Sequence, residues 1–245
     1  MTKITSREDL QNIREKGIKR LIPRHGRIAV GMGTCGTGNG ADKVYEAFAK
    51  ELHRRKSGIV LVKTGCFGFC AEEPLVNVCA AGRPLVILHT IEPRDVKAIV
   101  DDMTAGAVPH KKALCRIEEW DHLTAEKIVY GRGYGHIPLW SEVPFFKWQK
   151  KIVLRDCGII DPESIDEYIG VGGYQALFNV LHGSSGSQVI EEVKRSKLRG
   201  RGGAGFPTGR KWELMQQVQS DKKYVICNAD EGDPGAYMNR NEIES

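Results

Sequence analysis

The stretch "GIVLVKTGCFGFCAEEPLVNVCAAGRPLVILHT", from Gly58 to Thr90, decides the fold class of this chain. It holds three short apolar runs, at residues 58–64, 74–80 and 84–90, which are separated by turn residues. Short runs rich in Val, Ile and Leu between turns are typical of buried strands. The connection Ala81–Arg83 is short enough for a hairpin. We therefore predict three strands, of which the last two are neighbours.

The residues on either side extend these strands into a small α/β unit. "RIAV" at residues 27–30 predicts a first strand, and the glycine-rich residues 31–40 predict a loop. Residues 41–55 place apolar side chains at helical spacing, and residues 92–103 predict a closing helix with Pro in its first turn. The order βαβββα predicts a thioredoxin-like sandwich, in which one small sheet is covered by helices.

Flanking segments complete the expected organisation. Ser6 is the expected N-cap of a helix over residues 6–21, which we expect to be an appendage because Gly17 weakens it. Asp161 and Ser164 both suit the start of a later helix, and two more helices are expected after it, around residues 174–181 and 187–198. The expected segments are an N-terminal helical extension (1–25), the thioredoxin-like domain (26–108), a connector that clamps onto a neighbour through its aromatic residues (109–160) and a last domain (161–245).

Composition excludes several classes of function. Of 245 residues, 41% are hydrophobic, and the net charge of +5 is spread without the basic runs of a nucleic-acid-binding protein. No apolar stretch approaches the ~18 residues of a membrane span. The N-terminus lacks the apolar core of a signal peptide, which favours a cytoplasmic protein whose seven cysteines remain reduced.

Three cysteines are expected to meet at one end of the thioredoxin-like sheet. Cys66 and Cys70 lie in the loop after one strand, and Cys35 lies in the loop after the first strand. An iron-sulfur cluster usually requires four thiolates, and Cys79 on the next strand is the candidate for the fourth. A zinc site, a redox-active pair and buried structural cysteines are the alternatives.

The stretch "LRGRGGAGFPTGRKW", Leu198–Trp212, is expected to bind an anion. It contains G-x-G-x-x-G, but a helix rather than a strand precedes it, so a Rossmann site is excluded. Phe206-Pro207 stands where a P-loop needs Lys and then Ser or Thr, so that motif is excluded as well. Glycine amides beside several basic residues still suit a phosphate. The alternative is a flexible surface loop.

An acidic stretch follows the glycine loop. Residues 224–227 predict a strand, and after Asn228 come three carboxylates, Asp230, Glu231 and Asp233. Such carboxylates accept hydrogen bonds from ligand hydroxyls or bind a divalent cation. In isolation, the pattern favours a solvated turn.

These two motifs together carry a family resemblance. "LRGRGGAGFPTGRKW" with "NADEGDPGAYMNR" resembles the flavin site of the NADH-oxidising flavoprotein subunit of complex I and of its relatives in hydrogenases and formate dehydrogenases. "FFKWQKKIVLRDCGIIDPESIDEYIGVGGYQAL", residues 145–177, resembles the lead-in of members that carry a thioredoxin-like [2Fe-2S] ferredoxin domain ahead of the flavoprotein domain. The resemblance covers residues 25–245.

The resemblance implies a function. It implies an α/β FMN-binding domain that begins at residue 161, with FMN, NADH and a 2Fe-2S cluster as cofactors and a hydrogenase or formate dehydrogenase as partner. A 4Fe-4S site is expected only in family sequence beyond residue 245, so we expect this chain to be an N-terminal fragment. The alternative is a ferredoxin-like docking module that binds no flavin.

The resemblance also implies residue roles. Catalytic roles fall to Glu231 and Asp233, where the family often has Glu in place of Asp233. Val30 occupies the position of the family's usual first cluster ligand. Either Cys79 or an unidentified group therefore completes the ligand set with Cys35, Cys66 and Cys70, or the domain has lost its cluster. The implied FMN and NADH contacts are Gly200, Arg201, Gly202, Gly203, Ala204, Phe206 (near the nicotinamide), Lys211, Asn228, Asp230 and Glu231.

Overall fold

The computed structural model describes residues 4–107, 111–121, 127–226, 228–235, 239 and 243. The chain divides into two compact units. The first, here called the sheet unit, comprises Met1–Gly173 and Asp230–Ser245, and the second, the helical unit, comprises Tyr174–Ala229. No helix among the described residues is long and apolar enough to cross a membrane.

The sheet unit is built on five strands in the order β2-β1-β3-β4-β5. β1 pairs in parallel with β2, whereas β3 runs antiparallel to both β1 and β4. This arrangement of the first four strands confirms the predicted thioredoxin-like fold. Their bounds are β1 Arg27–Gly31, β2 Val60–Thr64, β3 Val76–Cys79, β4 Leu85–Leu88 and β5 Ala113–Ile117.

Strand β5 and a helix after β1 were not predicted. β5 pairs antiparallel with β4 and extends the sheet at its edge. Residues 34–38 of the expected loop form a short helix, α2 (Thr34–Gly38). Side-chain bonds to the backbone stabilise this turn, because Asn39 Nδ2 donates to Cys35 O at 2.8 Å and Thr37 Oγ1 donates to Gly33 O at 3.2 Å.

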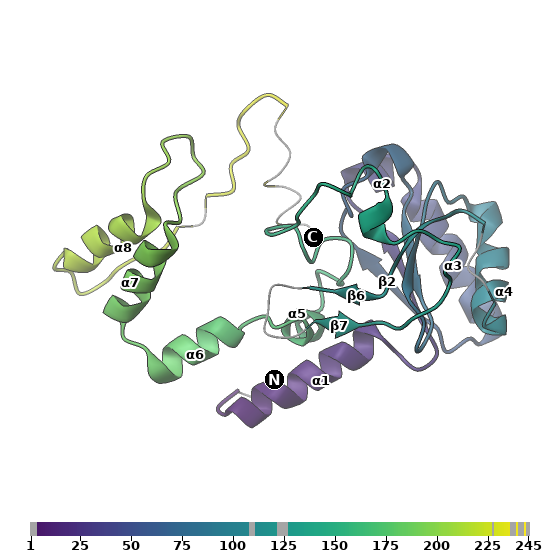
Figure 1. Cartoon of the computed structure of the whole chain (residues 1–245), viewed down its shortest axis with the longest axis horizontal. Coiled ribbons are helices and arrows are strands. Elements are labelled where there is room, and N and C mark those ends of the chain that lie inside the picture. Colours follow the sequence, from purple (N-terminus) through teal and green to yellow (C-terminus); the bar gives the residue numbers. More distant parts are fainter. Residues whose placement is uncertain are drawn as a thin grey trace. The chain divides into compact units, whose positions relative to one another are not determined.

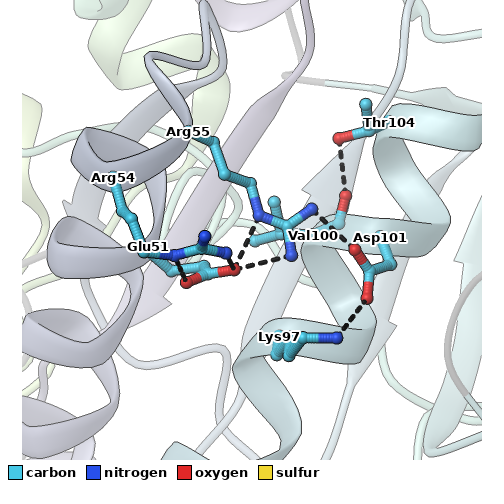
Figure 2. Close-up of polar contacts among 7 residues, drawn as sticks. All are labelled: Glu51, Arg54, Arg55, Lys97, Val100, Asp101 and Thr104. Atoms are coloured by element: carbon cyan, nitrogen blue, oxygen red, sulfur yellow. Dashed lines mark hydrogen bonds and ion pairs between the residues drawn. The ribbon is translucent and has the colours of Figure 1, made fainter.

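One face of the sheet is covered by two helices, α3 (Ala41–Arg55) and α4 (Val96–Ala105), as predicted (Figure 1). A 3-10 turn, Pro93–Asp95, leads into α4. Phe48 of α3 is fully buried in the core beneath these helices. Their outer surfaces are joined by ion pairs, in which Arg55 contacts both Glu51 and Asp101 at 2.6 Å (Figure 2).

The opposite face is covered by the connector that follows β5. Two short strands, β6 (Glu119–Trp120) and β7 (Ile128–Val129), and a 3-10 turn, Trp140–Glu142, lie in it. An aromatic cluster of Phe67, Trp120, Trp140 and Phe146 packs there, with ring centroids 5.0–6.2 Å apart. Trp120, Trp140 and Phe146 of the connector therefore pack on the sheet of their own unit, whereas Trp148 is exposed. Because both faces are covered, β3 and β4 are buried throughout.

Helix α1 (Arg7–Leu21) is integrated into the sheet unit and is not an appendage. Ser6 caps it as predicted, in a capping box with Asp9. It lies beside α5 (Ile165–Gly170), as Figure 1 shows, and Lys16 pairs with Asp166 of α5 at 2.7 Å. Helix α5 begins after Ser164, whose hydroxyl accepts from the Glu167 amide, so Ser164 and not Asp161 is the N-cap.

The helical unit contains α6 (Gln175–Gly183), α7 (Gly186–Ser196) and α8 (Thr208–Gln217), which agrees with the first two predicted helices. α7 and α8 are antiparallel, because Lys194 contacts Glu213 at 2.5 Å while Gln216 Nε2 donates to Ser187 Oγ at 3.2 Å. The expected strand at 224–227 is not formed at residues 224–226, where Val225 and Ile226 are exposed. Cys227 lies outside the described residues.

Candidate functional site

The cysteine site lies where the two parallel strands end. Because β1 and β2 run in the same direction, the segments that follow them emerge at one edge of the sheet. Cys35 lies in α2 just after β1, and Cys66 and Cys70 follow β2. Cys70 begins a 3-10 turn, Cys70–Glu72. The predicted convergence of these three cysteines is present in the structure.

The three thiols influence one another's ionisation. The pKa of Cys35 is raised, first by its hydrogen bond with Cys70 and then by burial. Burial is also the main cause that raises the pKa of Cys66 and of Cys70.

Two donors lie beside Cys66. The Gly68 amide donates to Cys66 Sγ at 3.2 Å. Lys151 Nζ lies 3.9 Å from the centroid of the Phe67 ring and donates to the Phe67 carbonyl. Burial lowers the pKa of Lys151 to about 8, while the charge of Cys66 partly opposes that effect. An anionic centre at Cys66 therefore has a hydrogen-bond donor and a cation close to it.

Cys79 is not brought to the other three cysteines. In the register of β1 with β3, Val30 faces Val76 at the cysteine edge, whereas Arg27 faces Cys79 at the opposite end. Burial raises the pKa of Cys79 to about 12. Val30 is fully buried in the core. Val30 is at the cysteine edge but has no ligating side-chain atom, and Cys79 is at the opposite end of β3, so neither residue can be the fourth ligand.

A fourth group beside the thiols is Glu73, which the sequence analysis did not single out. Its side chain is buried, and its Oε1 lies 4.0 Å from Cys66 Sγ. Burial raises the pKa of Glu73 to about 7, against the lowering effect of the Leu75 amide. In the sequence, the only signal for Glu73 is that it follows Cys70 by three residues. The stretch around it has the composition of a solvated turn.

Within the described residues, no three His, Cys, Asp or Glu side chains already surround one point as ligands of a single metal ion. A binuclear iron-sulfur cluster makes a different demand, because its four ligands are divided between two irons. The cysteine edge is therefore a candidate for a cluster whose ligands are shared between two irons.

The glycine loop of the helical unit connects α7 to α8. Its neck is closed by two backbone bonds, Gly200 N to Phe206 O and Thr208 N to Leu198 O, both of 2.9 Å. Gly203 and Gly205 have φ of +97° and +61°, which side-chain-bearing residues adopt only with strain. Residues 208–212 belong to α8, so the stretch is a tight loop followed by a helix N-terminus.

The tip of this loop is open and basic. Cβ atoms placed on Gly202 or Gly203 would meet nothing within 4 Å. Arg201, Ala204, Phe206 and Lys211 are exposed around it. Lys211 lies in the first turn of α8, where the partial positive charge of a helix N-terminus adds to its own. The geometry suits an anionic, flat ligand.

The residues of the acidic stretch, Asn228 to Asp233, are divided between the two units. Asn228 belongs to the helical unit, and Asp230, Glu231 and Asp233 belong to the sheet unit. Glu231 Oε1 accepts from the Asn239 amide at 2.8 Å. Their implied roles toward FMN and NADH stay predictions.

Comparison with known proteins supports the flavin motif. Residues 193–245 match the family model described as the Nuo51 FMN-binding domain. A subunit of the NADP-reducing hydrogenase of Solidesulfovibrio fructosivorans, HndC, is 54% identical over 98 residues, which are 40% of this chain and 20% of HndC. A protein of the NADH-quinone oxidoreductase of Aquifex aeolicus is 53% identical over 81 residues, which are 33% of this chain and 18% of that protein.

One relative extends over most of this chain. The alpha subunit of the NAD-reducing hydrogenase HoxS of Cupriavidus necator is 29% identical over 211 residues, 82% of this chain and 29% of that subunit. The chain thus spans less than a third of the length of each of these relatives. Among solved structures, a thioredoxin-like [2Fe-2S] ferredoxin from Aquifex aeolicus aligns with 38% of this chain and 93% of its own, at 20% identity and a TM-score of 0.34.

These findings confirm the resemblance that the sequence motifs carry. Residues 193–245 match the model of the Nuo51 FMN-binding domain, and a thioredoxin-like α/β unit lies ahead of them in the sequence. Hydrogenase and complex I subunits are its relatives. The expected link to formate dehydrogenase stays a prediction.

Proposed function

We propose that the chain belongs to an NADH-oxidising flavoprotein subunit of a cytoplasmic multi-subunit oxidoreductase, and that it passes electrons between NADH, FMN and iron-sulfur centres to a hydrogenase-type partner. The observation that carries this proposal is the loop between α7 and α8. Its closed neck, its two positive-φ glycines and the helix N-terminus after it form a phosphate-binding shape within the segment that matches the FMN-binding family.

The residues present at the loop fit FMN. Glycines at 202 and 203 leave space where a Cβ would otherwise stand, so backbone amides can approach a phosphate or a flat ring. Arg201 and Lys211 would hold the phosphate, and Phe206, exposed at the neck, would stack near the nicotinamide. FMN, when bound, accepts the electron pair of a hydride and releases electrons singly.

The family resemblance also assigns ligand contacts to the acidic stretch. Asn228, Asp230 and Glu231 would accept hydrogen bonds from ligand hydroxyls. Glu231 and Asp233, which we propose as catalytic residues, would orient the nucleotide so that its hydride lies against the flavin ring. Positioning of this kind contributes to catalysis because reacting groups are held in a near-attack geometry.

The cysteine edge would hold a 2Fe-2S cluster. The three thiols of Cys35, Cys66 and Cys70 converge there, the Gly68 amide donates to Cys66 Sγ, and Lys151 donates to the carbonyl of the neighbouring Phe67. These chain groups would stabilise the negative charge of a thiolate-bound centre. Cys79, at the other end of β3, would not take part.

Flavin binding by the 245-residue chain tests the proposal. We expect FMN fluorescence to be quenched on titration with the chain, and the bound yellow absorbance to be bleached by NADH. Gly203→Ala should weaken FMN binding, because Ala is strained at φ +97°. Gly183→Ala, where a Cβ meets open space in α6, is the matched control.

The competing function is a docking module without flavin. A folded chain that does not quench FMN fluorescence would favour that function.

A further inference from the structure

We propose that the carboxylate of Glu73 is the fourth protein ligand of the iron-sulfur cluster, beside the thiolates of Cys35, Cys66 and Cys70. This inference rests on the proposed function, which places a cluster at the cysteine edge. It departs from an all-cysteine ligand set, and it assigns the place that neither Val30 nor Cys79 can take.

The first support is the position of Glu73 among the three thiols. Its Oε1 faces Cys66 Sγ at 4.0 Å. Glu73 directly follows the turn Cys70–Glu72, and its Oε2 lies 3.3 Å from the position of a Cβ on Gly36, next to Cys35 in α2. The carboxylate therefore lies in the region where the segments of all three cysteines meet.

The second support is the space beside Gly31 and Gly36 in which the Glu73 carboxylate lies. A Cβ on Gly36 of α2 would lie 3.3 Å from Glu73 Oε2, and one on Gly31 would lie 3.6 Å from both carboxylate oxygens. The carboxylate thus lies between the end of β1 and the helix that carries Cys35. The absence of side chains at these two positions leaves room for it.

The third support is that the two carboxylate oxygens of Glu73 have different partners. Oε2 accepts a hydrogen bond from the Leu75 amide at 2.6 Å, which fixes the orientation of the carboxylate. Oε1 is then directed at Cys66. A ligating carboxylate is normally held in this way by a second hydrogen bond.

The fourth support is the cost of burial. A buried carboxylate is unfavourable unless it is paired or binds a metal, and Glu73 is only 6% exposed. Its charge lies beside three thiols, which would repel it once they ionise. Iron removes this conflict, because a cationic centre stabilises all four anionic ligands. Nitrogen ligands already replace two thiolates on one iron of Rieske centres, so a mixed ligand set is chemically sound.

The neighbouring acid, Glu72, provides a matched control. Its Oε2 contacts His89 Nδ1 at 2.6 Å, and its side chain is 30% exposed. It therefore faces a different partner one residue away in sequence. Glu72→Gln removes the same charge from the same turn without touching the proposed ligand.

The experiment uses the full chain, reconstituted anaerobically with ferrous iron and sulfide. Iron and sulfide content, visible absorption and the electron paramagnetic resonance spectrum after dithionite are measured for the unaltered protein and for Glu73→Gln, Glu73→Cys and Glu72→Gln. Far-ultraviolet circular dichroism establishes that each variant is folded.

We expect the unaltered chain and Glu72→Gln to bind about two irons and show the same spectra. Glu73→Gln should lose most of its iron, since a neutral amide is a poor ligand for iron. Glu73→Cys should retain iron, with shifted absorption bands and changed resonance positions, because a thiolate replaces an oxygen ligand.

Two results would overturn the assignment of Glu73. One is a folded Glu73→Gln protein with the iron content and resonance spectrum of the unaltered chain. The other, which decides the matter if Glu73→Gln does not fold, is a Glu73→Cys protein whose spectra match those of the unaltered chain. A folded unaltered chain that takes up no iron would instead refute the cluster itself, together with that part of the proposed function.

Discussion

Arg27 and Glu167 form an ion pair in the interior of the sheet unit, with Arg27 Nη2 2.9 Å from Glu167 Oε2, although 140 residues separate them in the chain. Arg27 begins β1, and Glu167 lies in α5. Arg27 Nη1 also donates to the Ile159 carbonyl at 3.0 Å, and the Asp161 amide donates to Glu167 Oε2 at 2.8 Å. The pair therefore joins the first strand of the sheet to the helix that closes this unit.

Breaking this pair is expected to destabilise the chain. Glu167→Gln leaves the Arg27 guanidinium buried without its counter-charge, which should lower the free energy of unfolding by about 3 kcal/mol. The measurement is urea denaturation followed by circular dichroism. Asp166→Asn, which breaks the more exposed pair with Lys16, should cost less than about 1 kcal/mol. Equal costs for the two variants would contradict the central role of the buried pair.

Gly17→Ala is expected to displace α1 from α5. A Cβ at Gly17 would lie 1.9 Å from the Asp166 carbonyl oxygen and 2.8 Å from Gly170 Cα, and backbone atoms cannot rotate away as a side chain can. The clash should lower the melting temperature and expose α1 to protease, although Ala is the better helix former. Gly183→Ala, in α6, should not lower it. A more stable Gly17→Ala protein would show that helix propensity dominates.

Acid is expected to weaken the ion pairs of Glu51 on the outer surface of α3. The hydrogen bonds of Arg54 and then Arg55 lower the pKa of Glu51 to about 2, from 4.5 (Figure 2). Because the folded-state pKa is the lower one, the stabilisation is complete above the unfolded value of 4.5 and is lost as the pH falls toward 2.

The test compares unfolding midpoints across this pH window. Glu51→Gln should be less stable than the unaltered chain at neutral pH and should show a shallower loss of stability below pH 4.5. Glu46→Gln in the same helix, whose contact with Lys50 is 4.0 Å long and exposed, should follow the unaltered chain. Identical acid profiles for all three proteins would refute the assignment.

Lys211→Ala is expected to weaken FMN binding by roughly 10-fold or more, which is the loss of one charge-assisted hydrogen bond. Lys211 lies in the first turn of α8, directly after the glycine loop. Lys222→Ala removes the same charge from another exposed position of the helical unit and should leave the affinity unchanged. Fluorescence titration with FMN measures both, and an equal loss in the two variants would indicate only nonspecific charge attraction.

Replacing cysteines at the two ends of the sheet is expected to have different effects on iron binding. Cys66→Ser should abolish iron binding, because Cys66 adjoins both the Gly68 amide and the Glu73 carboxylate. Cys79→Ser should keep it, since Cys79 pairs with Arg27 at the far end of β1. Loss of iron in a folded Cys79→Ser protein would restore Cys79 as a ligand.

The sequence predicted the central sheet well because its apolar runs are short and bounded by turns. It missed β5 (Ala113–Ile117), a short strand in which the polar Arg116 lies between Cys115 and Ile117, the only two buried residues of the strand. These two residues pack in the core cluster that contains connector residues such as Trp120 and Phe146. It also missed α2, a five-residue helix that depends on side-chain bonds of Thr37 and Asn39 and not on an apolar face.

The candidate site was predicted in part for similar reasons. Loops after parallel strands meet at one edge, so the grouping of Cys35 with Cys66 and Cys70 follows from strand order. Cys79 was a wrong candidate for the same edge because spacing alone does not give the direction of β3. Glu73 was missed because "AEEP" has the composition of a solvated turn, and its burial depends on α2, which the sequence did not predict.

The close crossing of α1 and α5 at Gly17 and Gly170 can be used to recognise related proteins that share this helix packing. The two backbones approach so closely there that a Cβ on Gly170 would lie 2.9 Å from the carbonyl carbon of Gly17. Neither position accepts a side chain without separating the helices, so the two glycines form a paired fingerprint. A chain that keeps both retains the docked N-terminal helix, whereas a chain that has replaced either one must hold its first helix elsewhere.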